Sequence, residues 1–227
     1  MTILLFLEGM VIKTDQVKIL KNNMDKSTME KLVKTYIFNK SKKKTIIFIH
    51  GLFGNSGFWL PFLPIFKKFK IIILDIDYLK LFENDLKKNN FVTYLDSILK
   101  KDEEYVTVSH SFGTIISQFF SFHKIKTSYE ICPIKSSVKN NKKKFIEEIN
   151  SLTNCSEKQI YNILEKANVF LSNDFCEENK FLNKKKYIPK IDLFFKDSFM
   201  NNIEYFEGDH FNILNSISMI NKDLNLN

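Results

Sequence analysis

The chain of 227 residues contains no arginine, and alanine occurs once, at Ala167. All 34 basic residues are therefore lysines, which outnumber the 26 acidic residues and give a net charge of +8. Lysine lacks the planar fork with which arginine grips phosphate or reads guanine through two hydrogen bonds. The positive charge alone consequently does not indicate nucleic-acid binding, and we expect no nucleic-acid partner.

The lysines gather in three runs, at residues 42–44, 142–144 and 184–186. Solvated surface is the simplest interpretation of these runs. A docking face for an acidic protein is the alternative, because clustered positive charge accelerates encounter with an acidic surface.

Cysteine is also scarce. Cys132, Cys155 and Cys176 form neither an even set nor a zinc-binding spacing, so we expect no disulfide framework, no metal site and a reducing compartment. The apolar stretch 3–7 is interrupted by Glu8 and follows no basic segment, unlike a secretory signal. No apolar run reaches the roughly 18 residues that span a bilayer. The sequence thus predicts a cytoplasmic protein without a membrane span.

Short runs rich in β-branched and aromatic residues alternate with segments of helical period. This alternation is typical of a mainly parallel sheet covered by helices on both faces. We therefore expect one α/β domain over residues 1–227, with helices near 90–100 and 114–122 and one or two strands before residue 38. The other expected strands are 45–49, 69–74, 105–108, 129–132, 191–195 and 203–206.

Residues from about 135 to 188 break this alternation. Ser156 and Gln159 fit a capping box at the start of a helix. One apolar helical face follows, made of Ile160, Ile163, Leu164, Ala167 and Leu171. We expect an insertion of at least two helices that forms a lid on the domain.

Ser111 lies between the expected strand at 105–108 and the next helix, with small residues Ser109 and Gly113 two positions away on either side. A turn between strand and helix that is this tight tolerates only small flanking side chains and projects the serine hydroxyl out of the sheet. The following helix places the partial positive charge of its N-terminus nearby. Ser111 is therefore the candidate nucleophile.

This segment resembles the nucleophile elbow of α/β-hydrolases, Gly-x-Ser-x-Gly, with Ser109 in place of the first glycine. The run from His50 to Gly54 is similar to the family's His-Gly loop, which follows an earlier strand. The resemblance implies an oxyanion hole made by the backbone N–H groups of Leu52 and Phe112, or of Phe53 if the loop is offset by one.

The general base is sought among four histidines. His50 belongs to the His-Gly loop, His110 is expected to point away from Ser111, and His123 ends a helix. His210 follows the last expected strand within Gly-Asp-His-Phe, which matches the family's Gly-x-His-Phe segment and chain order. The resemblance therefore makes His210 the base.

The acid that orients His210 is expected to be Asp197, which follows the expected strand at 191–195 and precedes His210 by 13 residues. Asp192 is expected inside that strand, and Asp209 lies too near His210 in the chain to orient it easily. Asp174 is the alternative, because some related thioesterases take the acid from elsewhere.

The resemblance implies the α/β-hydrolase fold and an acyl-enzyme mechanism that needs no cofactor. Small carboxylesterases, such as those that cleave the methyl ester of pimeloyl carrier protein, and type II thioesterases share this pattern. We expect a small acyl ester as substrate, with a thioester as the alternative and an acidic acyl carrier protein as a partner that suits the lysines. A noncatalytic ligand-binding protein on the same fold is an alternative of another class. The aromatic candidates for lining an acyl pocket are Phe53, Phe58, Trp59, Phe112 and Phe211.

Overall fold

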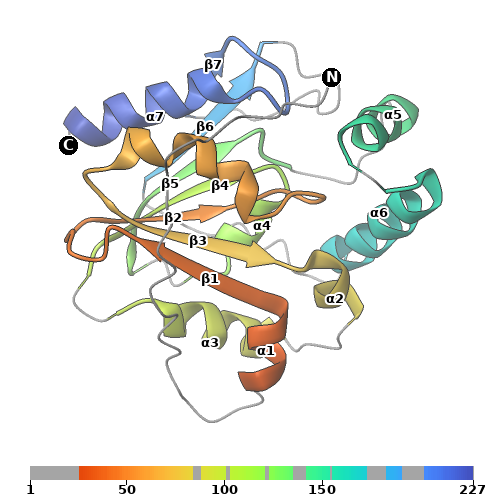
Figure 1. Cartoon of the computed structure of the whole chain (residues 1–227), viewed down its shortest axis with the longest axis horizontal. Helices are drawn as coiled ribbons and strands as arrows, with labels where there is room; N and C mark the ends of the chain where they lie inside the picture. Colours follow the sequence, from red (N-terminus) through yellow and green to blue (C-terminus); the bar gives the residue numbers. More distant parts are fainter. Residues whose placement is uncertain are drawn as a thin grey trace, which may run out of the picture.

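The structure is a computed structural model that describes residues 26–83, 88–100, 103–120, 123–134, 142–153, 155–172, 183–190 and 202–226. A seven-stranded sheet runs through it in the order β1-β3-β2-β4-β5-β6-β7 (Figure 1). Edge strand β1 is antiparallel to β3, and every other neighbouring pair is parallel. The strands are β1 (Val33–Phe38), β2 (Thr45–Ile49), β3 (Lys70–Ile76), β4 (Tyr105–His110), β5 (Ile125–Ile131), β6 (Lys184–Pro189) and β7 (Ile203–Phe206).

Helices cover both faces of the sheet (Figure 1). One face carries α1 (Lys26–Leu32), α3 (Lys88–Ile98) and α4 (Gly113–Ser117), and the other carries the 3-10 helix η1 (Ser56–Phe66) and α7 (Leu214–Leu226). Helix α2 (Tyr78–Glu83) directly follows β3. Helices α5 (Lys142–Leu152) and α6 (Glu157–Ser172) lie beyond the carboxyl ends of β2 and β3 (Figure 1).

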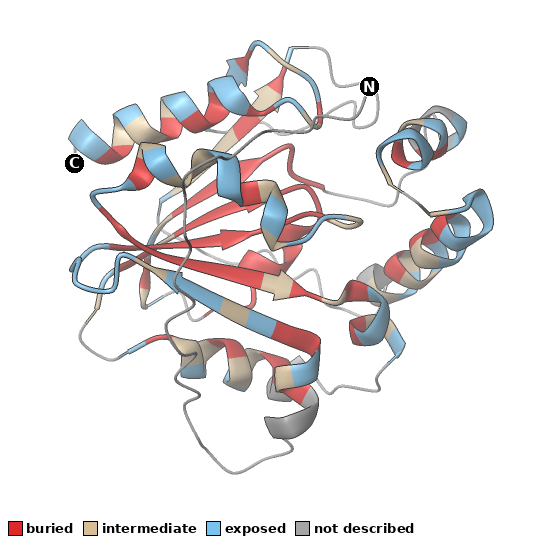
Figure 2. Ribbon diagram, viewed as in Figure 1, coloured by how far each residue is buried: buried red, intermediate tan, exposed pale blue. Residues whose placement is uncertain are grey.

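Strand β2 shows why the central strands read as unbroken apolar runs. All five of its residues are buried. Ile47 and Ile49 belong to the hydrophobic core under α3 and α4, whereas Ile46 and Phe48 belong to the core under η1 and α7. A strand that is buried on both faces needs apolar side chains at every position, and Figure 2 shows this buried band through the middle of the molecule.

The expected strands at 45–49 and 203–206 are confirmed with these bounds as β2 and β7. The strand expected at 191–195 lies outside the described residues, and the place between β5 and β7 is taken by β6 at Lys184–Pro189. The helical insertion expected up to residue 188 is therefore shorter, because residues 184–189 belong to the sheet.

The lysine run 184–186 is consequently not a purely solvated face, as the simplest interpretation had it. Lys184 Nζ lies 3.1 Å from Oε1 of Glu130, which is 2% exposed, and Lys185 Nζ lies 2.7 Å from Oδ1 of Asp223. Burial raises the pKa of Glu130, and the charge of Lys184 opposes that effect. Residues 42–44 are exposed, as expected.

A second charged cluster is formed by Glu103, which joins the starts of β3 and β4. Its Oε2 accepts hydrogen bonds from Lys70 Nζ at 2.8 Å and from the Tyr105 hydroxyl at 3.1 Å, and its Oε1 lies 3.0 Å from Lys100 Nζ. Partial burial opposes ionisation of Glu103, but these lysine and tyrosine contacts outweigh it and lower the pKa to about 2.

We predict that Glu103→Gln lowers the free energy of unfolding by about 1–2 kcal/mol at neutral pH, a value reduced for solvent screening. Because the folded pKa is depressed from 4.5 to about 2, the wild-type advantage is complete above the unfolded pKa. It is lost as the pH falls from 4.5 toward 2. Urea unfolding of both proteins across this range measures the effect. Glu104→Gln, whose side chain is 67% exposed in its pair with Lys126, is the control and is expected to change stability by less than about 0.5 kcal/mol.

Candidate functional site

Ser111 occupies a strained turn between β4 and α4. Its φ is 51°, in the left-handed region that residues other than glycine rarely adopt. The Ser111 N–H donates to the Ile131 carbonyl at 2.9 Å, and the residue is 6% exposed. A Cβ atom at Gly113 would lie 2.6 Å from the carbonyl oxygens of both Ile49 and His50. The turn is therefore held against the end of β2, and it requires glycine at position 113.

The loop after β2 lies directly against this turn. Gly54 N–H donates to the Gly51 carbonyl at 3.1 Å, and Phe53 has a φ of 67°. A Cβ atom at Gly51 would come within 2.9 Å of Ser111 Cβ. Among the described residues, no hydrogen bond uses the N–H of Leu52 or Phe112. The two expected oxyanion donors thus belong to two loops that meet beside Ser111, and both have a free N–H.

His50 fixes the position of that loop. Its Nε2 accepts a hydrogen bond from the Ile76 N–H at 2.9 Å, its Nδ1 lies 2.8 Å from the Gly51 carbonyl, and its own carbonyl accepts from the Tyr78 hydroxyl at 2.7 Å. Burial lowers the pKa of His50. These partners assign a neutral imidazole with its proton on Nδ1. His50 therefore ties the loop to the end of β3 and is not itself available to the serine.

His210 meets Ser111 from the other side. It lies between β7 and α7, is 2% exposed, and its Nε2 is 3.0 Å from Ser111 Oγ. Oδ1 of Asp209 accepts the N–H groups of Phe211 and Asn212, both at 2.8 Å, and so braces the loop. The fold thus brings together two residues separated by 99 positions. An imidazole at hydrogen-bond distance from a hydroxyl can accept its proton.

His110 has a partner that sequence reasoning missed. Its Nε2 donates to the His210 carbonyl at 2.7 Å, and its ring stacks on Phe58 with centroids 4.9 Å apart. Cys132 Sγ approaches the same carbonyl at 3.9 Å. Nothing in the sequence connects His110 to His210 except the proximity of His110 to Ser111.

Asp197, expected as the acid, lies outside the described residues, as do Asp174 and Asp192. The structure does change the argument about Asp192. Its exclusion depends on a strand at 191–195, whereas the strand that the structure describes before β7 is β6, which ends at Pro189. Asp192 follows the carboxyl end of that strand by three positions in the chain, so it joins Asp197 as a candidate.

Helices α5 and α6 cover the loops on either side of Ser111. The predicted capping box is confirmed: Ser156 N–H donates to Gln159 Oε1 at 2.8 Å, and Gln159 N–H donates to Ser156 Oγ at 3.4 Å. The two helices share a small hydrophobic cluster, against which Leu52, Phe53 and Phe211 pack. The buried members of this cluster are Ile146, Ile149, Ile160 and Leu164.

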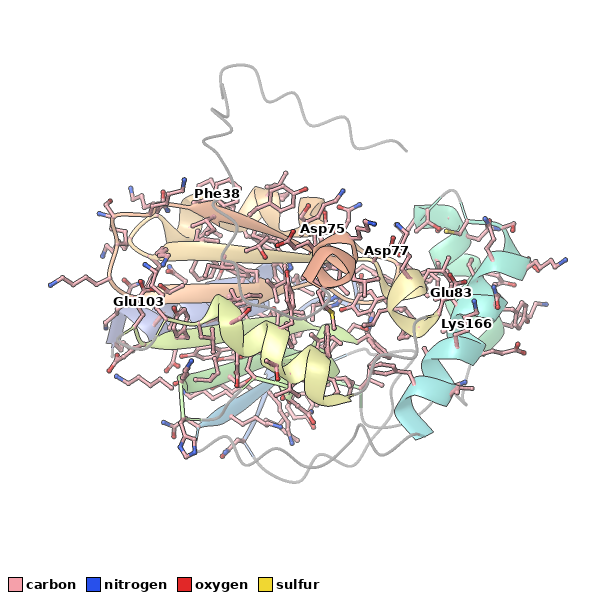
Figure 3. All side chains as sticks on the ribbon, turned by 90° about the horizontal axis from the view of Figure 1, so that it is seen from below. Phe38, Asp75, Asp77, Glu83, Glu103 and Lys166 are labelled. Atoms are coloured by element: carbon pink, nitrogen blue, oxygen red, sulfur yellow. The ribbon has the colours of Figure 1, made fainter. Side chains whose placement is uncertain are left out.

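An ion pair fastens α6 to α2. Lys166 Nζ lies 2.6 Å from Glu83 Oε1, and Figure 3 shows the two side chains facing each other between the helices. The rings of Phe82 and Phe170 pack beside this pair with centroids 5.2 Å apart. Both rings also lie near Phe112, the residue after Ser111, with centroids 5.6 and 6.1 Å away, so the helical pair is anchored to the main body through α2 and this ring.

The aromatic residues suggested for an acyl pocket have different roles. Trp59 and Phe112 are buried in the two cores, Phe58 stacks on His110, and Phe211 packs under α5 and α6. Phe53 lines a cleft together with Leu52. No group of three His, Cys, Asp or Glu side chains within the described ranges could hold a metal ion. No helix in the same ranges is long and apolar enough to cross a membrane.

No family model and no curated protein sequence matches the chain. Solved structures do match. The NocB thioesterase domain in covalent complex with a fluorophosphonate nocardicin G analogue gives a TM-score of 0.58 at 10% identity, over 84% of this chain and 99% of that one. The SrfTE thioesterase domain, which cyclises the lipopeptide antibiotic surfactin, gives 0.56 at 11% identity, over 84% and 95%.

Naproxen esterase from Bacillus subtilis gives a TM-score of 0.52 at 12% identity, over 86% of this chain and 87% of that one. Thioesterases and esterases thus share one architecture with this chain, including a mostly parallel sheet flanked by helices. At such low identity the likeness concerns the fold, and on that ground the chain adopts the α/β-hydrolase fold.

Proposed function

We propose that the protein is a serine hydrolase that cleaves a carboxylic ester through an acyl-enzyme. In this mechanism His210 Nε2 takes the proton of Ser111 Oγ while the oxygen attacks the acyl carbonyl. The N–H groups of Leu52 and Phe112 donate to the developing oxyanion. The observation that carries the proposal is the 3.0 Å contact between Ser111 Oγ and His210 Nε2, both residues being buried.

Collapse of the tetrahedral intermediate breaks the bond to the leaving oxygen, which receives its proton from His210. Water then gives a proton to His210 and attacks the acyl-enzyme, and the acid product leaves as Ser111 regains its hydrogen. A carboxylate at the Nδ1 side of His210 would hold the imidazole in the required tautomer, and we assign this role to Asp197, with Asp174 and Asp192 as the alternatives.

The substrate class follows less directly. Both thioesterases and esterases stand among the similar structures, and simple ester hydrolysis is the more widespread activity on this scaffold. A thioester carried by an acidic acyl carrier protein is the second candidate. Lys184 and Lys185 are engaged by Glu130 and Asp223. Residues 42–44 precede β2, at the opposite end of the parallel strands from Ser111, so a carrier would have to dock on lysines outside these two runs.

We predict that a fluorophosphonate probe labels Ser111, as mass spectrometry of the labelled peptide will show. Ser111→Ala abolishes labelling because the attacking oxygen is lost. His210→Ala slows it by about a thousandfold or more because no base remains. Ser218→Ala, which removes an exposed serine of α7, is the matched control and leaves the labelling rate unchanged. A folded wild-type protein that takes no label at Ser111 would favour the noncatalytic alternative.

A second prediction identifies the acid. Replacing the orienting aspartate by asparagine keeps its size but favours the wrong tautomer of His210, so ester hydrolysis falls by about a thousandfold or more. We expect this loss for Asp197→Asn and a change below about threefold for Asp174→Asn. Asp192→Asn is the third variant, and steady-state kinetics of all three decide which aspartate orients His210. A large loss of activity in Asp192→Asn alone would assign the role to Asp192.

A third prediction concerns His110, to which we assign a positioning role. Removing its hydrogen bond to the His210 carbonyl loosens the base, so His110→Phe lowers kcat about tenfold and changes KM by less than about twofold. His110→Gln, which keeps a donor, retains more of the kcat. Thermal unfolding of both variants is the control. If His110 only stabilised the fold, kcat would fall in proportion to the fraction of folded protein.

A further inference from the structure

A cleft of about 360 Å³ opens beside the loop after β2. We call it the β3 cleft, because it lies over the carboxyl end of that strand, between α1, α2 and the start of α6. Ser111 and His210 do not line it, but Leu52 does. The β3 cleft therefore begins at the residue to which we assign one oxyanion contact.

Part of the wall of the β3 cleft is apolar. Leu32, Ile76 and Tyr78 are buried core residues, and Ile163 of α6 is half-buried on the opposite side. Ligand sites usually combine such walls with a few placed polar groups. At roughly 30 Å³ for a water-sized group, the volume suits about a dozen non-hydrogen atoms, which is one arm of a small ester.

Charged side chains line the mouth of the β3 cleft, and the acids among them are already engaged. Asp75 accepts hydrogen bonds from Ser56 Oγ at 2.9 Å and Ser56 N–H at 3.3 Å, and Asp77 pairs with Lys80 Nζ at 2.7 Å. Figure 3 labels both aspartates toward the middle of the view, between the sheet and α2.

The remaining charges at the mouth are positive. Lys31 and Lys34 are exposed, and no ion pair or hydrogen bond within the described part of the chain engages either ammonium group. Lys34 lies opposite Asp75 in the pairing of β1 with β3, and its charge also contributes to lowering the pKa of Asp77. The mouth thus has two lysine ammonium groups that form no ion pair among the described residues, beside an apolar wall.

We propose that the β3 cleft binds one arm of the ester substrate and that this arm ends in an anionic group held by Lys31 and Lys34. The inference rests on the proposed function. When the carbonyl oxygen of an ester accepts a hydrogen bond from the Leu52 N–H, either the acyl chain or the leaving group of that ester extends toward the cleft. Leu32, Ile76 and Ile163 contact the apolar part of that arm. Lysine acts on the anion as a hydrated point charge, so a carboxylate is a suitable probe.

The test compares a neutral methyl ester with the monomethyl ester of a dicarboxylic acid of matched length, and with an ester whose carboxylate is on the leaving group. We expect kcat/KM to be at least about fivefold higher for one of the charged esters, mainly through KM. Whichever charged ester is preferred shows whether the acyl arm or the leaving arm occupies the β3 cleft. Equal rates for all three esters would overturn the inference and leave the proposed hydrolase intact.

Matched variants locate the effect. Lys31→Gln and Lys34→Gln each reduce the preference for the charged ester by roughly twofold, as expected for exposed charge pairs. Lys67→Gln removes the same charge from an exposed position outside the cleft and leaves the preference unchanged. Ile163→Trp narrows the cleft and raises KM for long esters but not for an acetate ester. A preference that survives in the Lys31/Lys34 double variant would refute the site.

Binding measured without turnover separates the inference from the proposed function. Ser111→Ala cannot form an acyl-enzyme, so calorimetry on this variant measures binding of the charged and neutral esters directly. Tighter binding of the charged ester, weakened by Lys34→Gln in the same background, supports the site even if hydrolysis is absent. Equal binding of both esters overturns it.

Discussion

Backbone contact between the loop after β2 and the turn after β4 is the constraint on which the site depends. A Cβ atom at Gly113 would collide with the carbonyl oxygens of Ile49 and His50, and a Cβ atom at Gly51 would collide with Cβ of Ser111. Larger residues at either position would separate the two loops. The N–H groups of Leu52 and Phe112 could then no longer act together as the oxyanion donors that we propose.

Much of this could be predicted from the sequence, because the responsible signals are local. Strand β2 is an unbroken apolar run buried on both faces, and the turn at Ser111 carries its own pattern of small residues. The pairing of Ser111 with His210 could be anticipated only through resemblance, since the two are far apart in the chain. Contacts such as that between His110 and the His210 carbonyl could not be predicted, because a backbone acceptor leaves no trace in residue type.

Strand β6 marks the point at which periodicity failed. The strand begins with three lysines, a sequence that is typical of solvated surface. Lysines 184 and 185 are tolerated in the sheet because Glu130 and Asp223 from other elements compensate their charges. The sequence instead predicts a strand at the more apolar run 191–195. A strand near the edge of a sheet can thus be polar when its partners supply the opposite charge, and sequence alone does not show those partners.

The left-handed backbone of Ser111 has a consequence for stability. A side chain in that conformation costs about 1–2 kcal/mol relative to a relaxed residue, and glycine would adopt the same φ of 51° with little strain. A protein in which the Ser111 hydroxyl had no role would therefore be more stable with glycine at this position. Serine in this turn after the central strand β4 therefore costs stability that glycine would not cost.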